Sequence, residues 1–169
     1  MAEDLRPQFT RVRQIVEAFG FPIFEMDGYE ADDLIGTLAA QAEQAGLDVL
    51  IVTGDTDTLQ LVTPHTRVMI TRRGATDTVT YDEAGVRERY GLAPEQLTDL
   101  RGLRGDASDN IPQVPGIGDK TAASILQQYG TVEKAFASLN SMDAKLRAKL
   151  EGYEEQARRN KSLATIVRD

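Results

Sequence analysis

Seven acidic residues gather in three short clusters of the 169-residue sequence. They are Glu30, Asp32 and Asp33 in the first cluster, Asp55 and Asp57 in the second, and Asp106 and Asp109 in the third. Carboxylate oxygens are hard ligands that suit Mg²⁺, Mn²⁺ or Ca²⁺. If the clusters converge, like-charge repulsion destabilises the fold unless cations neutralise it. The pattern therefore predicts a metal centre, and two ions held in this way are suited to hydrolysis of a phosphodiester.

Each cluster taken alone also has a structural interpretation. Acidic residues in the first turn of a helix interact favourably with its dipole, and Gly-Asp pairs are common in turns. Only the combination of three clusters favours a functional site over these alternatives.

Composition limits the chemistry further. The chain has no cysteine and a single histidine, His65, which excludes thiolate zinc sites, disulfides and multi-histidine metal sites. The net charge of −8 argues against a nucleic-acid partner. However, setting aside the seven candidate ligands leaves a charge of −1, and two divalent ions would contribute +4. The metal-loaded protein need not repel DNA.

The first half of the sequence predicts an α/β fold with a mainly parallel central sheet flanked by helices. Apolar spacing predicts helices over 5–19, 31–42 and 82–90, and strands over 21–26, 49–52, 68–71 and 78–81. The run Val49–Val52 is aliphatic without alternation, which favours a parallel strand covered on both faces. The first two acidic clusters follow predicted strand ends, where sites of open parallel sheets form. We expect them to share one crevice.

The second half is predicted to be helical. Helices are expected over 94–103, 119–129, 131–139 and 142–165, the last one broken at Gly152, and the three-residue spacing of Asp106 and Asp109 favours one side of a helical turn. We therefore predict a metal-binding core over 1–92 and a helical subdomain over 93–169. No apolar run is long enough to span a membrane and the first residues are acidic, so a cytoplasmic location is expected.

A glycine-rich stretch from Val114 to Ala122 predicts a backbone contact with DNA. It places two glycines and Lys120 at the start of a helix, where main-chain amides and an ammonium group suit a phosphate. The alternative is a hairpin that merely joins two helices, with Lys120 in solvent.

These motifs together resemble the 5'-to-3' exonuclease domain of bacterial DNA polymerase I and its flap endonuclease relatives. The matching stretches are Gly28–Asp33, Thr53–Leu61, and Gly105–Pro112 running into Val114–Ala122. The resemblance implies a PIN-like nuclease core followed by a helix-hairpin-helix subdomain, with all seven carboxylates as catalytic ligands of two Mg²⁺ or Mn²⁺ ions. It also implies DNA contacts, often accompanied by a potassium ion, at Gly116, Ile117, Gly118, Lys120 and Thr121.

The resemblance also has departures. Members of the family begin with an aspartate-bearing strand and a basic helical arch, whereas Met1–Gln8 resembles the stretch just after the arch. The chain is therefore expected to be a fragment with impaired cleavage of flaps or nicked duplexes, and a polymerase domain can follow it. Gln113 stands where glycine is usual. The alternative hypotheses are a non-catalytic module that binds duplex DNA and an unrelated phosphohydrolase that acts on small substrates.

Overall fold

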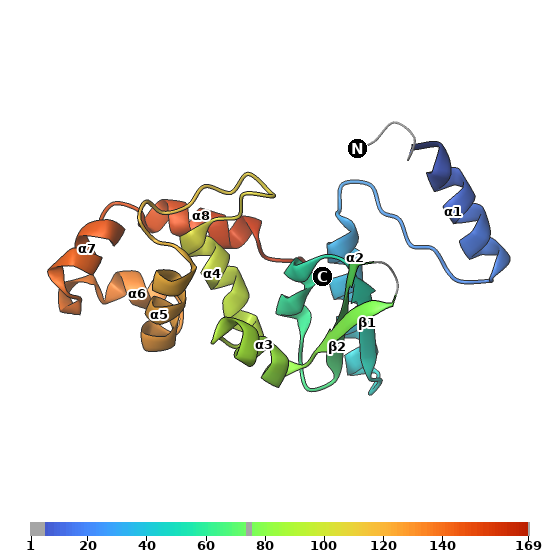
Figure 1. The fold of residues 1–169 in the computed structure, drawn as a ribbon, viewed down its shortest axis with the longest axis horizontal. Helices are drawn as coiled ribbons and strands as arrows, with labels where there is room; N and C mark the ends of the chain where they lie inside the picture. The colour runs from blue at the N-terminus through green and yellow to red at the C-terminus, as the bar shows by residue number, and fades with distance from the viewer. Residues whose placement is uncertain (1–5, 74–75, 169) are drawn as a thin grey trace.

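The computed structural model describes residues 6–73 and 76–168, with a small sheet between a helical region and an isolated N-terminal helix (Figure 1). The first half contains α1 (Arg6–Ala18), α2 (Ala31–Gln44), β1 (Val49–Thr53), η1 (Thr56–Leu61), β2 (Thr66–Arg73), β3 (Asp77–Tyr81) and α3 (Glu83–Tyr90). The second half contains η2 (Pro94–Gln96), α4 (Leu97–Arg104), α5 (Asp119–Tyr129), α6 (Val132–Ala137), η3 (Leu139–Ser141), α7 (Ala144–Leu150) and α8 (Glu154–Leu163). No helix in the described ranges is both long and apolar enough to cross a membrane.

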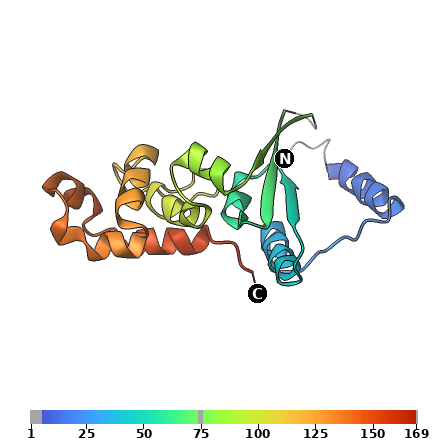
Figure 2. The same cartoon turned by 90° about the horizontal axis from the view of Figure 1, so that it is seen from below.

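The sheet has the order β1-β2-β3. β1 and β2 are parallel, with Val49 opposite Thr66, and β2 and β3 are antiparallel. Ile51, Val68 and Ile70 are buried in the core, and α2 packs along the sheet, as Figure 2 shows. This arrangement confirms the predicted α/β fold class and places the end of β1 directly before Asp55.

Two predicted features of the sheet are wrong. Residues 21–26 form no strand, and no described strand lies beside them to complete a hydrogen-bonded ladder. β1 is also not covered on both faces, because Leu50 and Val52 are 50% and 61% exposed. Among the described residues, only the face that carries Ile51 is packed against the core.

The helical half follows the prediction closely. Gly152, with φ of +86°, separates α7 from α8, as expected for a residue that tolerates the left-handed region. α4 crosses α8 at short range, since a Cβ on Gly102 would lie 2.9 Å from the carbonyl oxygen of Ala157. Asn160 of α8 donates to the carbonyls of Gly102 (3.2 Å) and Pro112 (2.7 Å). α4 and the loop after it are therefore anchored on α8.

The C-terminal segment joins the two halves. The buried side chain of Gln60 donates to the carbonyl of Ala164 (3.0 Å) and accepts from the amide of Ile166 (3.0 Å). The amide of Val167 donates to Oδ1 of Asp33 (2.9 Å). These bonds fix the first and second acidic clusters relative to α8.

Gly105 shapes the loop that carries the third acidic cluster. Its φ is +71°, and a Cβ there would lie 2.6 Å from both the amide nitrogen of Gln113 and the carbonyl oxygen of Ile111. Backbone atoms cannot yield as a flexible side chain can, so only glycine fits this position.

We predict that Gly105→Ala lowers the free energy of unfolding by about 2 kcal/mol or more, because the methyl group meets backbone on two sides. Urea denaturation measures this change. Gly54→Ala is the matched control, since a Cβ there would meet only the hydroxyl of Thr71 at 3.8 Å. Equal stability of the two variants would contradict the assigned role of Gly105.

Candidate metal centre and DNA-contacting hairpin

The third acidic cluster lies in a tight loop after α4. The amide of Asp106 donates to the carbonyl of Ile111 (2.9 Å), and its carbonyl accepts from the amide of Ile111 (2.8 Å). Asn110 has a positive φ of 57°. The predicted helical turn is therefore wrong, because this closed loop with a left-handed residue cannot continue a helix. The expected convergence nevertheless occurs. Asp57, Asp106 and Asp109 each offer a carboxylate oxygen within 4.8 Å of the other two.

The second acidic cluster is held by its own backbone at the end of β1. Oδ1 of Asp55 accepts from the amide of Asp57 (2.8 Å) and begins η1, while the amide of Asp55 donates to Oγ1 of Thr53 (3.0 Å). This short-range network turns the chain sharply after the strand. It directs Asp57 toward α4 and leaves Asp55 exposed.

The first acidic cluster begins α2. Oδ2 of Asp33 accepts from the amide of Glu30 (3.1 Å), as in a capping box, and its Oδ1 holds the amide of Val167. Glu30 is exposed and Asp32 is partly buried. Asp33 thus has a structural role that the spacing alone did not reveal.

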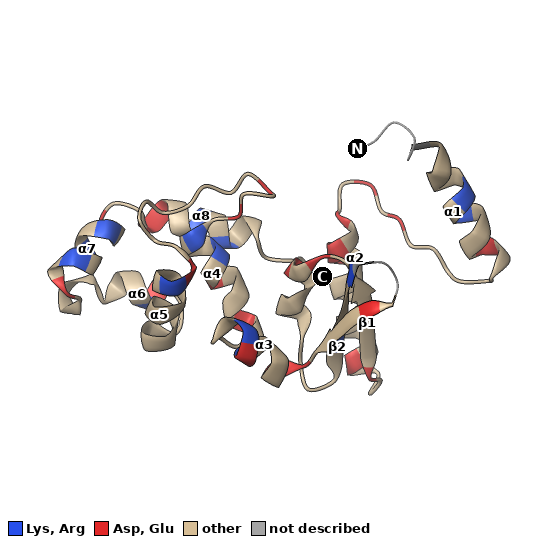
Figure 3. Ribbon diagram, in the orientation of Figure 1, with Lys and Arg blue, Asp and Glu red and all other residues tan. Residues whose placement is uncertain are grey.

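The seven carboxylates line two adjoining clefts rather than one crevice. One cleft, of about 660 Å³, is lined by Asp55, Asp57, Asp106 and Asp109. The other, of about 600 Å³, is lined by Glu30, Asp32 and Asp33 together with Asp57 and Asp109. Because Asp57 and Asp109 belong to both, the three clusters form one continuous acidic surface. Figure 3 shows acidic stretches at the start of α2 and in the loop after α4.

Arg101 is the residue that sequence reasoning missed. Its side chain is only 5% exposed, and it donates from Nη2 to Oδ1 of Asp57 and from Nε to Oδ2 of Asp106 (3.3 Å). One guanidinium thus joins the second and third clusters. The signal was present in the spacing, since Arg101 lies four residues after buried Leu97 on the core-facing side of α4.

Crowding of carboxylates alters their proton affinities. Burial raises the pKa of Asp57 to about 6, and the charges of Asp55, Asp106 and Asp109 add to the effect, although Arg101 opposes it. Burial likewise raises the pKa of Asp32, and the charge of Asp55 is the next largest cause. Raised values are expected where anions gather without a cation.

Asp106 shifts in the opposite direction. Burial acts to raise its pKa, but hydrogen bonds from Ser108 and the charges of Arg101 and Arg104 outweigh burial and lower the pKa. Asp106 therefore stays ionised, as a metal ligand must. The oxygen-only donor set of Asp57, Asp106 and Asp109 fits a hard divalent cation.

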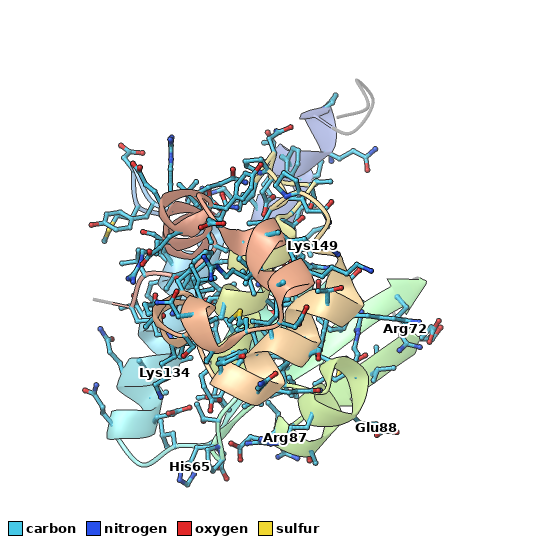
Figure 4. The ribbon with its side chains drawn as sticks, turned by 90° about the vertical axis from the view of Figure 1, so that its left-hand side faces the viewer. His65, Arg72, Arg87, Glu88, Lys134 and Lys149 are labelled. Carbon is cyan, nitrogen blue, oxygen red and sulfur yellow. The ribbon has the colours of Figure 1, made fainter. Side chains whose placement is uncertain are left out.

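The glycine-rich hairpin lies between α4 and α5. Gly116 and Gly118 are exposed, with Gly118 directly before α5, and Lys120 lies exposed in the first turn of this helix beside partly buried Thr121. The predicted contact Ile117 is different, because its side chain is fully buried in the core. His65 lies elsewhere, at the lower edge of Figure 4, with its Nδ1 3.1 Å from Asp48.

The geometry defines a class of protein with two parts. An α/β core carries a cluster of carboxylates that could hold a metal ion, and a helical unit with an exposed hairpin follows it. The chain belongs to the 5'-3' exonuclease family. Residues 1–91 match its N-terminal resolvase-like domain and residues 92–169 its C-terminal SAM fold.

Known proteins agree with this assignment. The chain is 50% identical over 167 residues to the DNA polymerase I of Bacillus caldotenax, covering 98% of this chain and 19% of that relative. T5 5'-exonuclease with bound divalent metal ions (zinc) is 25% identical, with a TM-score of 0.82, covering 97% of this chain and 62% of that one. A T5 flap endonuclease in a pseudo-enzyme-product complex with DNA and metal ions gives a TM-score of 0.81 at 25% identity, covering 97% and 62%.

We predict that the metal-free protein loses stability as the pH rises through about 6. The folded pKa of Asp57 is raised above its unfolded value, so the folded state binds more protons in this window and ionisation disfavours folding. Mg²⁺ should therefore stabilise the protein more at about pH 7.5 than at about pH 5. Thermal unfolding at both pH values with and without Mg²⁺ tests this, and an equal Mg²⁺ effect at both would contradict it.

A second prediction concerns the buried guanidinium. Arg101→Met leaves Asp57 and Asp106 facing one another without their shared cation, which should lower the free energy of unfolding by about 3–5 kcal/mol. Mg²⁺ should restore part of the loss. Urea unfolding with and without Mg²⁺ measures both effects. Arg87→Met, which removes an exposed arginine of α3, is the control and should change little.

Proposed function

We propose that the chain is a structure-specific 5'-to-3' DNA exonuclease or flap endonuclease domain that hydrolyses phosphodiesters. The observation that carries this proposal is the convergence of oxygens from Asp57, Asp106 and Asp109 beside the other four acidic residues. The chain spans 19% of its DNA polymerase I relative, so a polymerase domain in the same protein is a proposed partner. A cytoplasmic location belongs to the same proposal.

The cofactor in this proposal is a pair of Mg²⁺ or Mn²⁺ ions. Asp57, Asp106 and Asp109 would hold one ion. Glu30, Asp32 and Asp33 of the adjoining cleft, together with Asp55 of the first cleft, would hold the second. Such ions activate water and stabilise the leaving oxygen of a phosphodiester. The chain's own contribution is to hold the ligands in place. Arg101 binds the carboxylates of Asp57 and Asp106. The bonds from the amides of Glu30 and Val167 to Asp33 fix the start of α2 beside the second cleft.

The proposed substrate is DNA with a 5' flap or a nick, bound without regard to base sequence. Gly116 and Gly118 are exposed just before α5, and Lys120 is exposed in its first turn, an arrangement of amides and a basic side chain that suits a backbone phosphate. Ile117 contributes by packing the hairpin onto the core.

A module that binds duplex DNA without cutting it is the second candidate. It is favoured by the position of the hairpin on the helical half, because Gly116 and Lys120 lie outside both acidic clefts. DNA binding is therefore structurally separable from the metal centre.

We predict that Asp57→Asn lowers Mg²⁺-dependent cleavage of a 5'-flap duplex by about a hundredfold or more, since loss of one ligand weakens the ion held with Asp106 and Asp109. Gel analysis of end-labelled flap substrate measures cleavage, and fluorescence anisotropy measures binding. Asp48→Asn, at an exposed aspartate paired with His65, is the matched control.

The two candidates give different results in this experiment. Cleavage that disappears on chelation and in Asp57→Asn supports the nuclease. Duplex binding by the unmodified chain with cleavage at background supports the binding module. Cleavage that is unchanged in Asp57→Asn contradicts the assigned metal centre.

A further inference from the structure

Two carbonyl groups of the hairpin already accept hydrogen bonds from side chains of the same chain. Nε2 of Gln113 donates to the carbonyl of Ile117 (2.7 Å), and Nζ of Lys149, from α7, donates to the carbonyl of Gly116 (3.0 Å). The resemblance to helix-hairpin-helix proteins implies a potassium ion at this hairpin, and such an ion would need these main-chain oxygens.

Several other carbonyls of the same loop are engaged as well. Those of Pro112 and Gln113 accept from Gln156 at 3.2 Å, and that of Pro112 also accepts from Asn160. Backbone amides occupy the carbonyls of Val114 (3.0 Å) and Gly118 (2.9 Å). A cation would therefore have to displace or share several existing hydrogen bonds.

Lys149 adds a direct electrostatic obstacle. Its Cδ and Cε lie 3.7 and 3.6 Å from the Cβ position that Gly116 leaves open, so its stem runs along the glycine and brings the ammonium to the loop. A lysine ammonium is a compact point charge that repels a second cation placed a few ångströms away. The potassium ion implied by the resemblance therefore does not fit this hairpin.

We propose that Lys149 takes the place of a monovalent cation at the hairpin and supplies its positive charge there. Gln113 stands where the family usually has glycine. Its side-chain amide donates to the carbonyl of Ile117 and so occupies a second oxygen that a cation would need. The hairpin then binds a DNA phosphate without requiring potassium. Figure 4 shows Lys149 on the helical end of the molecule, together with Lys134. The DNA part of this proposal rests on the proposed function, whereas the cation part does not.

The cation part is tested on the protein without DNA. In excess Mg²⁺, which keeps Tl⁺ and K⁺ out of the acidic clefts, thallium-205 NMR with Tl⁺ as the probe should show no saturable binding to the unmodified chain. Under the same conditions, unfolding temperatures should agree in KCl and NaCl of equal ionic strength. Saturable Tl⁺ binding, or stabilisation by KCl alone, would overturn the proposal.

The DNA part is tested by fluorescence anisotropy with a nicked duplex in KCl and in NaCl. The unmodified chain should bind equally in both salts to within about twofold, and Lys149→Met should bind about fivefold more weakly in both, with a salt slope reduced by about one. Lys145→Met is the matched control, because it removes the same charge from the exposed face of α7 without breaking a bond to the hairpin.

The outcomes separate this inference from the function it builds on. Binding that is at least about fivefold tighter in KCl than in NaCl overturns it. So does a Lys149→Met variant that binds like Lys145→Met. If no variant binds DNA in either salt, the proposed function fails, while the Tl⁺ result still decides the cation question.

Discussion

The guanidinium of Arg101 is the contact on which the rest of the site depends. Asp57 follows a strand and Asp106 follows a helix more than forty residues later, and each carboxylate would repel the other if they met unpaired. A guanidinium as deeply buried as that of Arg101 is costly unless it is paired. Burial of α4 therefore depends on the two ion pairs, and the ion pairs form only when α4 is packed in place. Packing of the helical half therefore determines the geometry of the acidic cleft.

Hydrogen bonds also fix the side of the acidic surface that is formed by the start of α2. The buried amide of Gln60 and the carboxylate of Asp33 both bind the backbone after α8, which brings the C-terminal segment across the start of α2. Because buried polar groups must find partners, these bonds specify one arrangement of the two halves rather than a range. The carboxylates are preorganised before any cation arrives, which lowers the reorganisation that ion binding demands.

The charge distribution separates the proposed metal site, which is acidic, from the proposed DNA-contacting hairpin, which is basic. The clefts concentrate seven carboxylates, whereas Lys120 and Lys149 place ammonium groups at the hairpin, and Figure 3 shows basic residues along α7. A net charge of −8 is thus compatible with DNA binding, since the negative charge is local and cations can neutralise it. Separation of the two sites lets backbone contact and hydrolysis be tested independently.

Much of this molecule was determined by the sequence alone. Hydrophobic spacing and glycine positions predicted α2, α3, α5, β1 and the break at Gly152. Such features depend on neighbours along the chain. The clustering of acidic residues predicted that the second and third clusters converge, as Asp57, Asp106 and Asp109 do. The exposed face of β1, the unpaired segment 21–26, the loop around Asp106 and the partners of Arg101 and Lys149 were decided only by the tertiary structure. The loop around Asp106 is closed by its own hydrogen bonds to Ile111, which the spacing of the two aspartates does not reveal. The other features depend on which distant segment lies alongside, and residue spacing does not encode that contact.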